Sequence, residues 1–182
     1  ESERERVLAV LRAENLIDRN RSLALASMPL HIALITADES AAQADFMHSL
    51  IESRLPWRVE FIDSKVQGAG AERTIAAALR TAQRNKVDVI ALVRGGGSRL
   101  DLAIFDHEVV ARAIANSSVP VFTGIGHEID TSVADVVAHC ANKTPTACAE
   151  ALIDIAMEVV TRGETAWGDI AEIVSTTLEV ER

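Results

Sequence analysis

Three glycines between an arginine and a serine form the segment of this sequence best suited to binding an anion. The run Arg94-Gly95-Gly96-Gly97-Ser98 directly follows an apolar stretch at residues 87–93. Glycines let the backbone approach a ligand closely with its amides turned toward a negative charge, and a guanidinium forms paired hydrogen bonds with phosphate oxygens. A tight turn that needs positive φ angles is the simpler alternative for any single glycine. An arginine followed by three glycines favours phosphate or another anion.

A histidine and a carboxylate three residues apart follow the next apolar stretch, in the segment Gly126-His127-Glu128-Ile129-Asp130. An imidazole that a carboxylate orients can act as a general acid or base near neutral pH. Asp130 or Thr131 could instead cap the helix that follows, where Ser132 to Asp135 resembles a capping box. A histidine, a glutamate and an aspartate could also hold a metal ion. The spacing alone leaves acid–base catalysis, helix capping and metal binding open.

A third candidate segment is acidic. Asp38 and Glu39 precede a helical pattern, and Asp45 lies one turn into it. Carboxylates at the start of a helix are stabilised by the helix dipole. Their position alone therefore favours a structural role for these three residues.

The elements that position these segments alternate along the chain. Four short apolar runs, at residues 31–36, 57–62, 87–93 and 119–125, predict strands, and helical spacing separates them. One helical pattern includes Leu102, Phe105, Val109 and Ala113. Alternation at about 30 residues per unit predicts an α/β fold, a Rossmann-like doubly wound and mainly parallel sheet with flanking helices. Ligands bind outside the carboxyl ends of such strands, where all three candidate segments begin.

The two ends of the chain read differently from its centre. Residues 1–29 are predicted to form a lead-in helix and linker, residues 30–145 an α/β core, and residues 146–182 a C-terminal helical segment. Thr144 and Pro145 suit the N-cap and first position of that last helix. Its apolar residues recur at spacings of three and four, so it either begins a coiled coil or packs back on the domain.

Composition narrows the function classes. The chain has 182 residues, 48% of them hydrophobic, which excludes disorder. A net charge of −9 argues against a non-specific nucleic-acid coat, although most of the 18 basic residues are arginine. Cys140 and Cys148 match no zinc pattern and are expected to be free thiols in a reducing, cytoplasmic compartment. No apolar run reaches the ~18 residues of a membrane span, so no membrane association is expected.

The pairing of Arg94-Gly-Gly-Gly-Ser98 with Gly126-His-Glu-Ile-Asp130 resembles the large subunit of exonuclease VII. Further segments agree in order and spacing, and the resemblance covers roughly residues 5–155. These segments are Val66-Gln67-Gly68, Asp101-Leu102, Phe105-Asp106, Ala134-Asp135 and Thr144-Pro145-Thr146-Ala147.

The resemblance implies an enzyme that degrades single-stranded DNA from either end and releases short 5′-phosphorylated oligonucleotides. It also implies a complex with several copies of the exonuclease VII small subunit. Family members carry an N-terminal OB-fold that we expect to be absent from this chain, and the helical segment after the core would begin the region that binds small subunits. No cofactor is strictly required in the family, although Mg²⁺ is possible, and no metal ligand is assigned.

By position, the family's catalytic set falls on Asp45, Arg94, His127 and Asp130, and the phosphate-binding set on Arg94, Gly95, Gly96, Gly97 and Ser98. Where the family usually has Thr-Ser-Pro-Thr-Gly-Ala-Ala, this chain has Thr36-Ala-Asp-Glu-Ser-Ala-Ala42, which puts two acids beside the expected phosphate. The alternative is therefore a catalytically inactive or divergent Rossmann-like module that binds a nucleotide or nucleic acid.

Overall fold

A five-stranded parallel sheet forms the centre of the molecule. The computed structural model describes residues 2–96, 99–126 and 131–180. The strands are arranged in the order β2-β1-β3-β4-β5, and every neighbouring pair is parallel. They are β1 (His31–Thr36), β2 (Arg58–Asp63), β3 (Val89–Val93), β4 (Val121–Gly124) and β5 (Cys140–Asn142). The predicted α/β doubly wound fold is confirmed.

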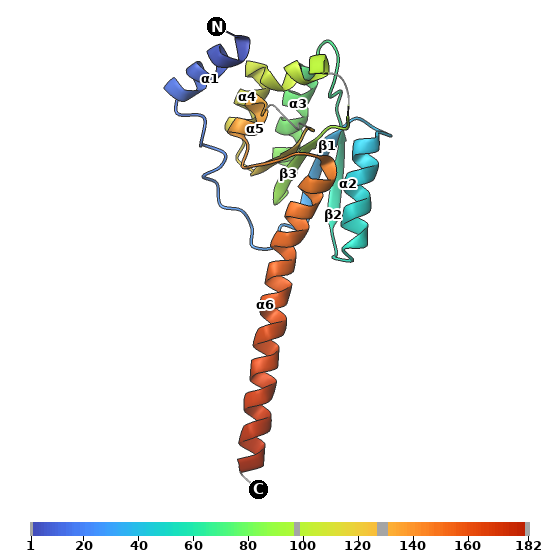
Figure 1. The fold of residues 1–182 in the computed structure, drawn as a ribbon, viewed down its shortest axis with the longest axis vertical. Helices are drawn as coiled ribbons and strands as arrows, with labels where there is room; N and C mark the ends of the chain where they lie inside the picture. Colours follow the sequence, from blue (N-terminus) through green and yellow to red (C-terminus); the bar gives the residue numbers. More distant parts are fainter. Residues whose placement is uncertain (1, 97–98, 127–130, 181–182) are drawn as a thin grey trace.

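Helices cover both faces of this sheet (Figure 1). One face carries α2 (Ala41–Glu52) and the start of α6 (Pro145–Val180), which enclose a core around Phe46, Phe122 and Leu152. The opposite face carries the remaining helices and a second core. These are α1 (Glu3–Ala13), α3 (Ala71–Arg84), the 3-10 helix η1 (Arg99–Asp106), α4 (Glu108–Ala115) and α5 (Val133–Val137).

Alternation along the central strands explains why the sheet is buried on both sides. In β1, Ile32 and Leu34 belong to one core, whereas Ala33 and Ile35 belong to the other. Successive side chains of a strand point to opposite faces, so a strand covered on both faces must be apolar throughout. All five residues of β3 are buried for the same reason.

The strand order creates a switch point between β1 and β3. After β1 the chain continues into α2 on one face, and after β3 it continues into η1 and α4 on the other face. Connections that leave neighbouring strands in opposite directions open a crevice at their carboxyl ends, and ligands bind there. In this sheet the switch-point region, named the crevice, lies where residues 37–40 follow β1 and residues 94–96 follow β3.

Two details of the predicted elements are wrong. The helical pattern through Leu102, Phe105 and Val109 is not one helix, because His107 ends η1 and caps α4, its side chain accepting a hydrogen bond from the Val109 amide at 3.3 Å. A fifth strand, β5, also joins the sheet. Its three residues contain no apolar run, so only pairing with β4 reveals it.

Helix α1 packs against the α/β body. Val7, Leu8 and Leu11 are buried in the same core as α3 and α4. The Arg112 guanidinium also donates two hydrogen bonds to the Glu14 carboxylate, at 2.5 and 2.7 Å, just beyond the end of α1. The division at residues 29 and 145 stays a prediction.

Helix α6 has two parts of different character. Cys148, Leu152 and Ala156 are fully buried, whereas every residue from 161 to 171 is exposed. Figure 1 shows this helix starting beside the sheet and extending far beyond the α/β body. The C-terminal helix is confirmed, and its start as a coiled coil stays a prediction. Within the described residues, no helix combines the length and apolar character needed to cross a bilayer.

Candidate active site

Arg94 is the charged group placed most deeply at the carboxyl edge of the described sheet. It directly follows β3, and only 2% of it is exposed. Its backbone amide donates to the Gly124 carbonyl at 3.0 Å, which joins the ends of β3 and β4. A guanidinium stays charged at any ordinary pH. The backbone hydrogen bond fixes the main chain of Arg94, and its burial limits where the side chain can lie. The edge therefore contains a positive charge held at a defined place.

Gly95 lies against the first turn of α2. A Cβ built on Gly95 would lie 3.6 Å from both the Cβ and the backbone nitrogen of Ala42. Ser40 caps this helix, its hydroxyl accepting from the Gln43 amide at 3.2 Å, and the first turn holds no acidic residue. The first amides of a helix lack partners within it and attract anions. Gly95 and the start of α2 together can approach a phosphate from two sides.

Of the other predicted phosphate ligands, the structure describes Gly96. Gly96 is exposed, and a Cβ there would meet nothing within 4 Å, so its backbone is accessible from solvent. Gly97 and Ser98 lie outside the described residues. The structure thus brings Arg94 and Gly95 to the switch point beside α2.

The predicted catalytic residues divide in the same way. Asp45 is exposed on α2, one turn beyond Ala42, the residue that faces Gly95. His127 and Asp130 lie outside the described residues. Their roles therefore stay predictions, although the chain on either side of them is described.

The chain enters the segment of His127 through two constrained glycines. A Cβ on Gly124 would lie 2.7 Å from the Thr144 carbonyl oxygen and 2.9 Å from the Cys148 Cβ. Gly126 has a φ of +85°, a left-handed conformation that suits glycine. The start of α6 therefore packs directly on the end of β4, and only a residue without a side chain fits between them.

A buried carboxylate, that of Asp135, lies shortly after that segment. Asp135 accepts hydrogen bonds from the Thr123 hydroxyl at 2.6 Å and from the Ser132 hydroxyl and amide at 2.7 and 3.0 Å. The predicted capping box of Ser132 and Asp135 is confirmed. Because Ser132 caps α5, the alternative that Asp130 or Thr131 caps this helix is wrong. No sequence signal linked Thr123 to this box, since the two lie in different elements.

The acidic first segment borders the crevice. The Asp38 amide donates to an Asp63 carboxylate oxygen at 3.0 Å, so the ends of β1 and β2 bring two acids together. Glu39, with a φ of +51°, donates its amide to the Asp38 carboxylate at 3.0 Å. These groups place negative charge close to the start of α2.

Neither metal ligation nor thiol chemistry gains support from the described residues. They contain no group of three or more His, Cys, Asp or Glu side chains arranged to hold a metal ion. Cys140 and Cys148 are free, as predicted, and burial raises the pKa of each thiol. Thiols that resist ionisation are poor nucleophiles and poor metal ligands.

Comparison with known proteins gives the site its context. The family described as "Exonuclease VII, large subunit" matches residues 16–182. The chain belongs to this family. Exodeoxyribonuclease 7 large subunit of Synechococcus sp. (strain CC9605) is 42% identical over 153 residues, which cover 82% of this chain and 39% of that protein. The same-named protein of Shouchella clausii is 39% identical over 160 residues, covering 87% of this chain and 35% of its own.

This member of the exonuclease VII large-subunit family thus spans between a third and two fifths of the length of these relatives. Among solved structures, a lysine decarboxylase of Francisella novicida aligns with 74% of this chain and 18% of its own. Its TM-score is 0.40 at 10% identity, so the likeness says nothing about function.

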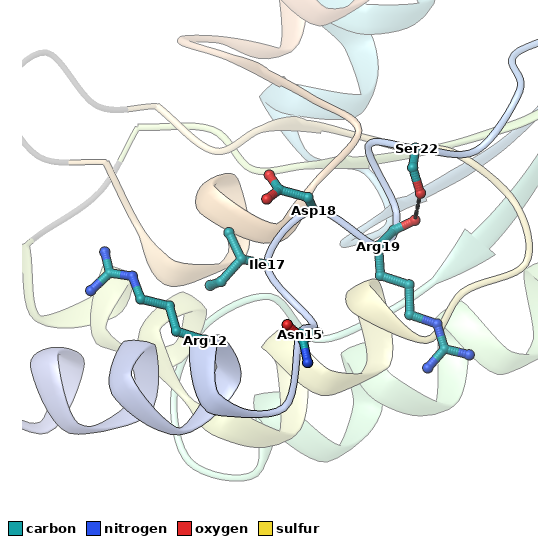
Figure 2. A pocket seen from close by; sticks show the side chains of 6 residues that line it. All are labelled: Arg12, Asn15, Ile17, Asp18, Arg19 and Ser22. Atoms are coloured by element: carbon teal, nitrogen blue, oxygen red, sulfur yellow. Dashed lines mark hydrogen bonds between the residues drawn. The ribbon is translucent and has the colours of Figure 1, made fainter.

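A surface hollow on this exonuclease VII family chain lies away from the crevice. It is lined by six residues at the end of α1 and in the linker that follows, namely Arg12, Asn15, Ile17, Asp18, Arg19 and Ser22 (Figure 2). The Arg19 guanidinium donates to the Asn116 side chain at 2.8 Å, which places the hollow near the end of α4. None of the predicted site residues lines it, so it is separate from the candidate active site.

Proposed function

We propose that this chain is the catalytic domain of an exodeoxyribonuclease VII large subunit. It hydrolyses phosphodiester bonds of single-stranded DNA from either end and releases short 5′-phosphorylated oligonucleotides. The observation that carries the proposal is the buried Arg94 at the switch point of the sheet, followed by Gly95, which lies against the start of α2.

The chemistry follows from the groups at that edge. Arg94 and the amides of residues 95–97 bind the scissile phosphate and stabilise the negative charge that develops on it. A water oxygen attacks phosphorus, the bond to the 3′ oxygen breaks, and the phosphate stays on the 5′ end of the released product. His127 activates the water or protonates the leaving oxygen, and Asp130 or Asp45 orients the His127 imidazole.

In this proposal, fixed groups of the protein stabilise the negative charge that a metal ion stabilises in other nucleases. A buried guanidinium and backbone amides need no reorganisation when charge develops, and a site that excludes water strengthens their effect. No cofactor is strictly required, and Mg²⁺ remains compatible with the carboxylates near the edge.

The remaining parts of the proposal concern the assembly. Several copies of the exonuclease VII small subunit bind the complete large subunit, with α6 beginning the region that recruits them. The exposed Trp167 and Ile170 on the outer part of α6 support a helical partner there. An OB-fold that binds the single strand completes the enzyme, which acts in the cytoplasm.

A binding module without catalytic activity is the second candidate. The acids Asp38, Glu39 and Asp63 favour it, because they lie near the start of α2 and repel a phosphate backbone. Such a module would hold a nucleotide or nucleic-acid end without cleaving it.

One digestion experiment separates these candidates. The complete large subunit, assembled with its small subunit, is mixed with end-labelled single-stranded DNA in excess EDTA. His127→Ala is compared with His48→Ala, which removes a histidine that is 72% exposed on α2. Release of oligonucleotides by the wild type and His48→Ala, but not by His127→Ala, supports the nuclease.

The other outcomes have defined meanings. Activity that appears only when Mg²⁺ is added would make His127, Glu128 and Asp130 candidate metal ligands. Binding of DNA without cleavage in either condition would support the binding module and overturn the nuclease.

A further inference from the structure

We propose that Arg4 is a positioning residue for this active site, and the proposal rests on the function proposed above. Its guanidinium Nη2 donates to the Thr131 backbone carbonyl at 2.7 Å, across 127 positions of the sequence. Thr131 directly follows Asp130, so Arg4 holds the end of the segment that carries His127 and Asp130.

The backbone of Arg4 is held in place by the helix to which it belongs. It lies in the first turn of α1, and the next turns bury Val7, Leu8 and Leu11 in the core shared with α5. The Ser2 hydroxyl caps α1, and the Glu5 side chain accepts a hydrogen bond from the Ser2 amide in return. A long side chain that starts from a packed and capped helix can hold a distant carbonyl at a defined place.

Stability alone does not account for this arrangement. The Nε of Arg4 is buried and has no hydrogen-bond partner among the residues that the structure describes, which costs free energy. Thr131 is exposed, so water could satisfy its carbonyl if Arg4 were absent. The contact thus leaves one donor of Arg4 buried and fixes a carbonyl that water could otherwise satisfy.

The two residues after Thr131 are anchored as well. The Ser132 amide donates to Asp135 of α5 at 3.0 Å, and the Val133 amide donates to Asp106 of η1 at 2.8 Å. Three consecutive residues are therefore held by side chains of α1, α5 and η1. Among these three anchors, Arg4 holds the carbonyl next to Asp130. A shift of about 1 Å in a catalytic group can lower a rate by as much as 100-fold.

The test compares Arg4→Met with Arg6→Met in the complete enzyme. Methionine keeps much of the length of the side chain and removes the hydrogen bond. Arg6 lies on the same helix, and its guanidinium pairs with Glu3 at 2.6 Å instead of reaching the site. We expect Arg4→Met to lower kcat for single-stranded DNA by about 10-fold, with KM and Tm unchanged. Arg6→Met retains the wild-type kcat, and Arg4→Lys, which keeps one donor, falls between them.

An unchanged kcat in Arg4→Met would overturn the inference, as would an equal loss in Arg6→Met. A loss that follows a lowered Tm in both Arg4→Met and Arg4→Lys would assign Arg4 to folding and also overturn it. An inactive wild-type enzyme would overturn the proposed function itself, whereas an active wild type with unaffected Arg4→Met overturns only the role of Arg4.

Discussion

The two edges of the sheet are built on opposite principles. At the amino edge, side chains complete the backbone hydrogen bonds of the strand starts. Asn20, fully buried, accepts from the Val121 amide at 2.9 Å and donates to the Val119 carbonyl at 3.1 Å. The Asp88 carboxylate accepts from the His31 amide at 2.9 Å. A hydrogen bond from the His31 ring to Glu60 closes this edge and lowers the pKa of that carboxyl.

At the carboxyl edge, glycines that follow or end the strands add close backbone approach to the side-chain hydrogen bonds. Gly95 lies against α2, Gly124 lies against α6, and Gly126 turns with positive φ. Arg94 is buried among them. The amino edge therefore stabilises the fold through satisfied polar groups. The carboxyl edge instead brings glycine backbone and one buried cation together at the switch point, where an open α/β sheet binds its ligands.

Removal of the cation at the carboxyl edge is expected to have the largest effect on activity. Arg94→Ala is expected to lower the rate of single-stranded DNA cleavage by about 100-fold or more, because charge on the phosphate loses its stabilising group. Arg58→Ala, at the start of β2, removes an arginine that is 73% exposed at the amino edge and serves as the control. Rates are measured with the assembled enzyme. Equal rates for the two variants would contradict a catalytic role for the carboxyl edge.

A side chain added at Gly124 tests the packing between the end of β4 and the start of α6. Gly124→Ala places a Cβ 2.7 Å from a backbone oxygen of Thr144, so the start of α6 must move. We expect a loss of about 2 kcal/mol in the free energy of unfolding, measured by denaturant titration. Gly163→Ala in the exposed part of α6 meets nothing within 4 Å and should add about 0.5–1 kcal/mol. A neutral Gly124→Ala would show that the contact with α6 gives way easily.

Removal of the Asn20 side chain at the amino edge should lower stability and leave activity unchanged. Asn20→Ala leaves the amide of Val121 without its partner, and we expect a loss of about 1–2 kcal/mol in the free energy of unfolding. Below the melting temperature, kcat should equal that of the wild type. Asn116→Ala, an exposed side chain after α4, is expected to change the free energy of unfolding by less than about 0.5 kcal/mol. A large fall in kcat of folded Asn20→Ala would mean that the two edges are coupled.

The smallest expected effect concerns the acidic residues beside the crevice. The double substitution Asp38→Asn/Glu39→Gln removes two negative charges, while the side-chain amide oxygen introduced at position 38 can still accept from the backbone of residue 39. We expect the Kd for single-stranded DNA to fall severalfold at low salt, with the gain fading as ionic strength rises. Glu158→Gln/Glu164→Gln on exposed α6 changes the net charge equally and should leave the Kd unaltered. Equal gains from both pairs would assign the effect to net charge alone.

Local patterns predicted most of the fold. The four apolar runs became β1 to β4, and the central strand β3, which is buried on both faces, is apolar at every position. The missed strand, β5, has three residues that pair only with β4, and pairing of that kind leaves no local trace. The break at His107 was missed because the apolar spacing continues across it, although the hydrogen bonding does not.

The placement of the described residues of the candidate site was predictable from the sequence, whereas their roles stay predictions. Arg94 and Gly95 lie at the switch point as their position after a strand implied, and Asp45 lies one turn along the adjoining helix. The contribution of Thr123 to the capping box was not predictable, since it reaches Asp135 from a different element.

Apolar patterns and motifs in the sequence were enough to predict the parallel sheet, the edge on which chemistry is expected and the family to which the chain belongs. Periodicity, glycine content and motif spacing are local properties that a single strand or turn already carries. Other contacts exist only in the folded chain: Gly124 fits beneath Thr144, Asn20 completes the start of β4, and Arg4 reaches Thr131. These contacts join segments 20 to 127 positions apart. They depend on how packed elements align in space, and no spacing along the chain encodes that alignment.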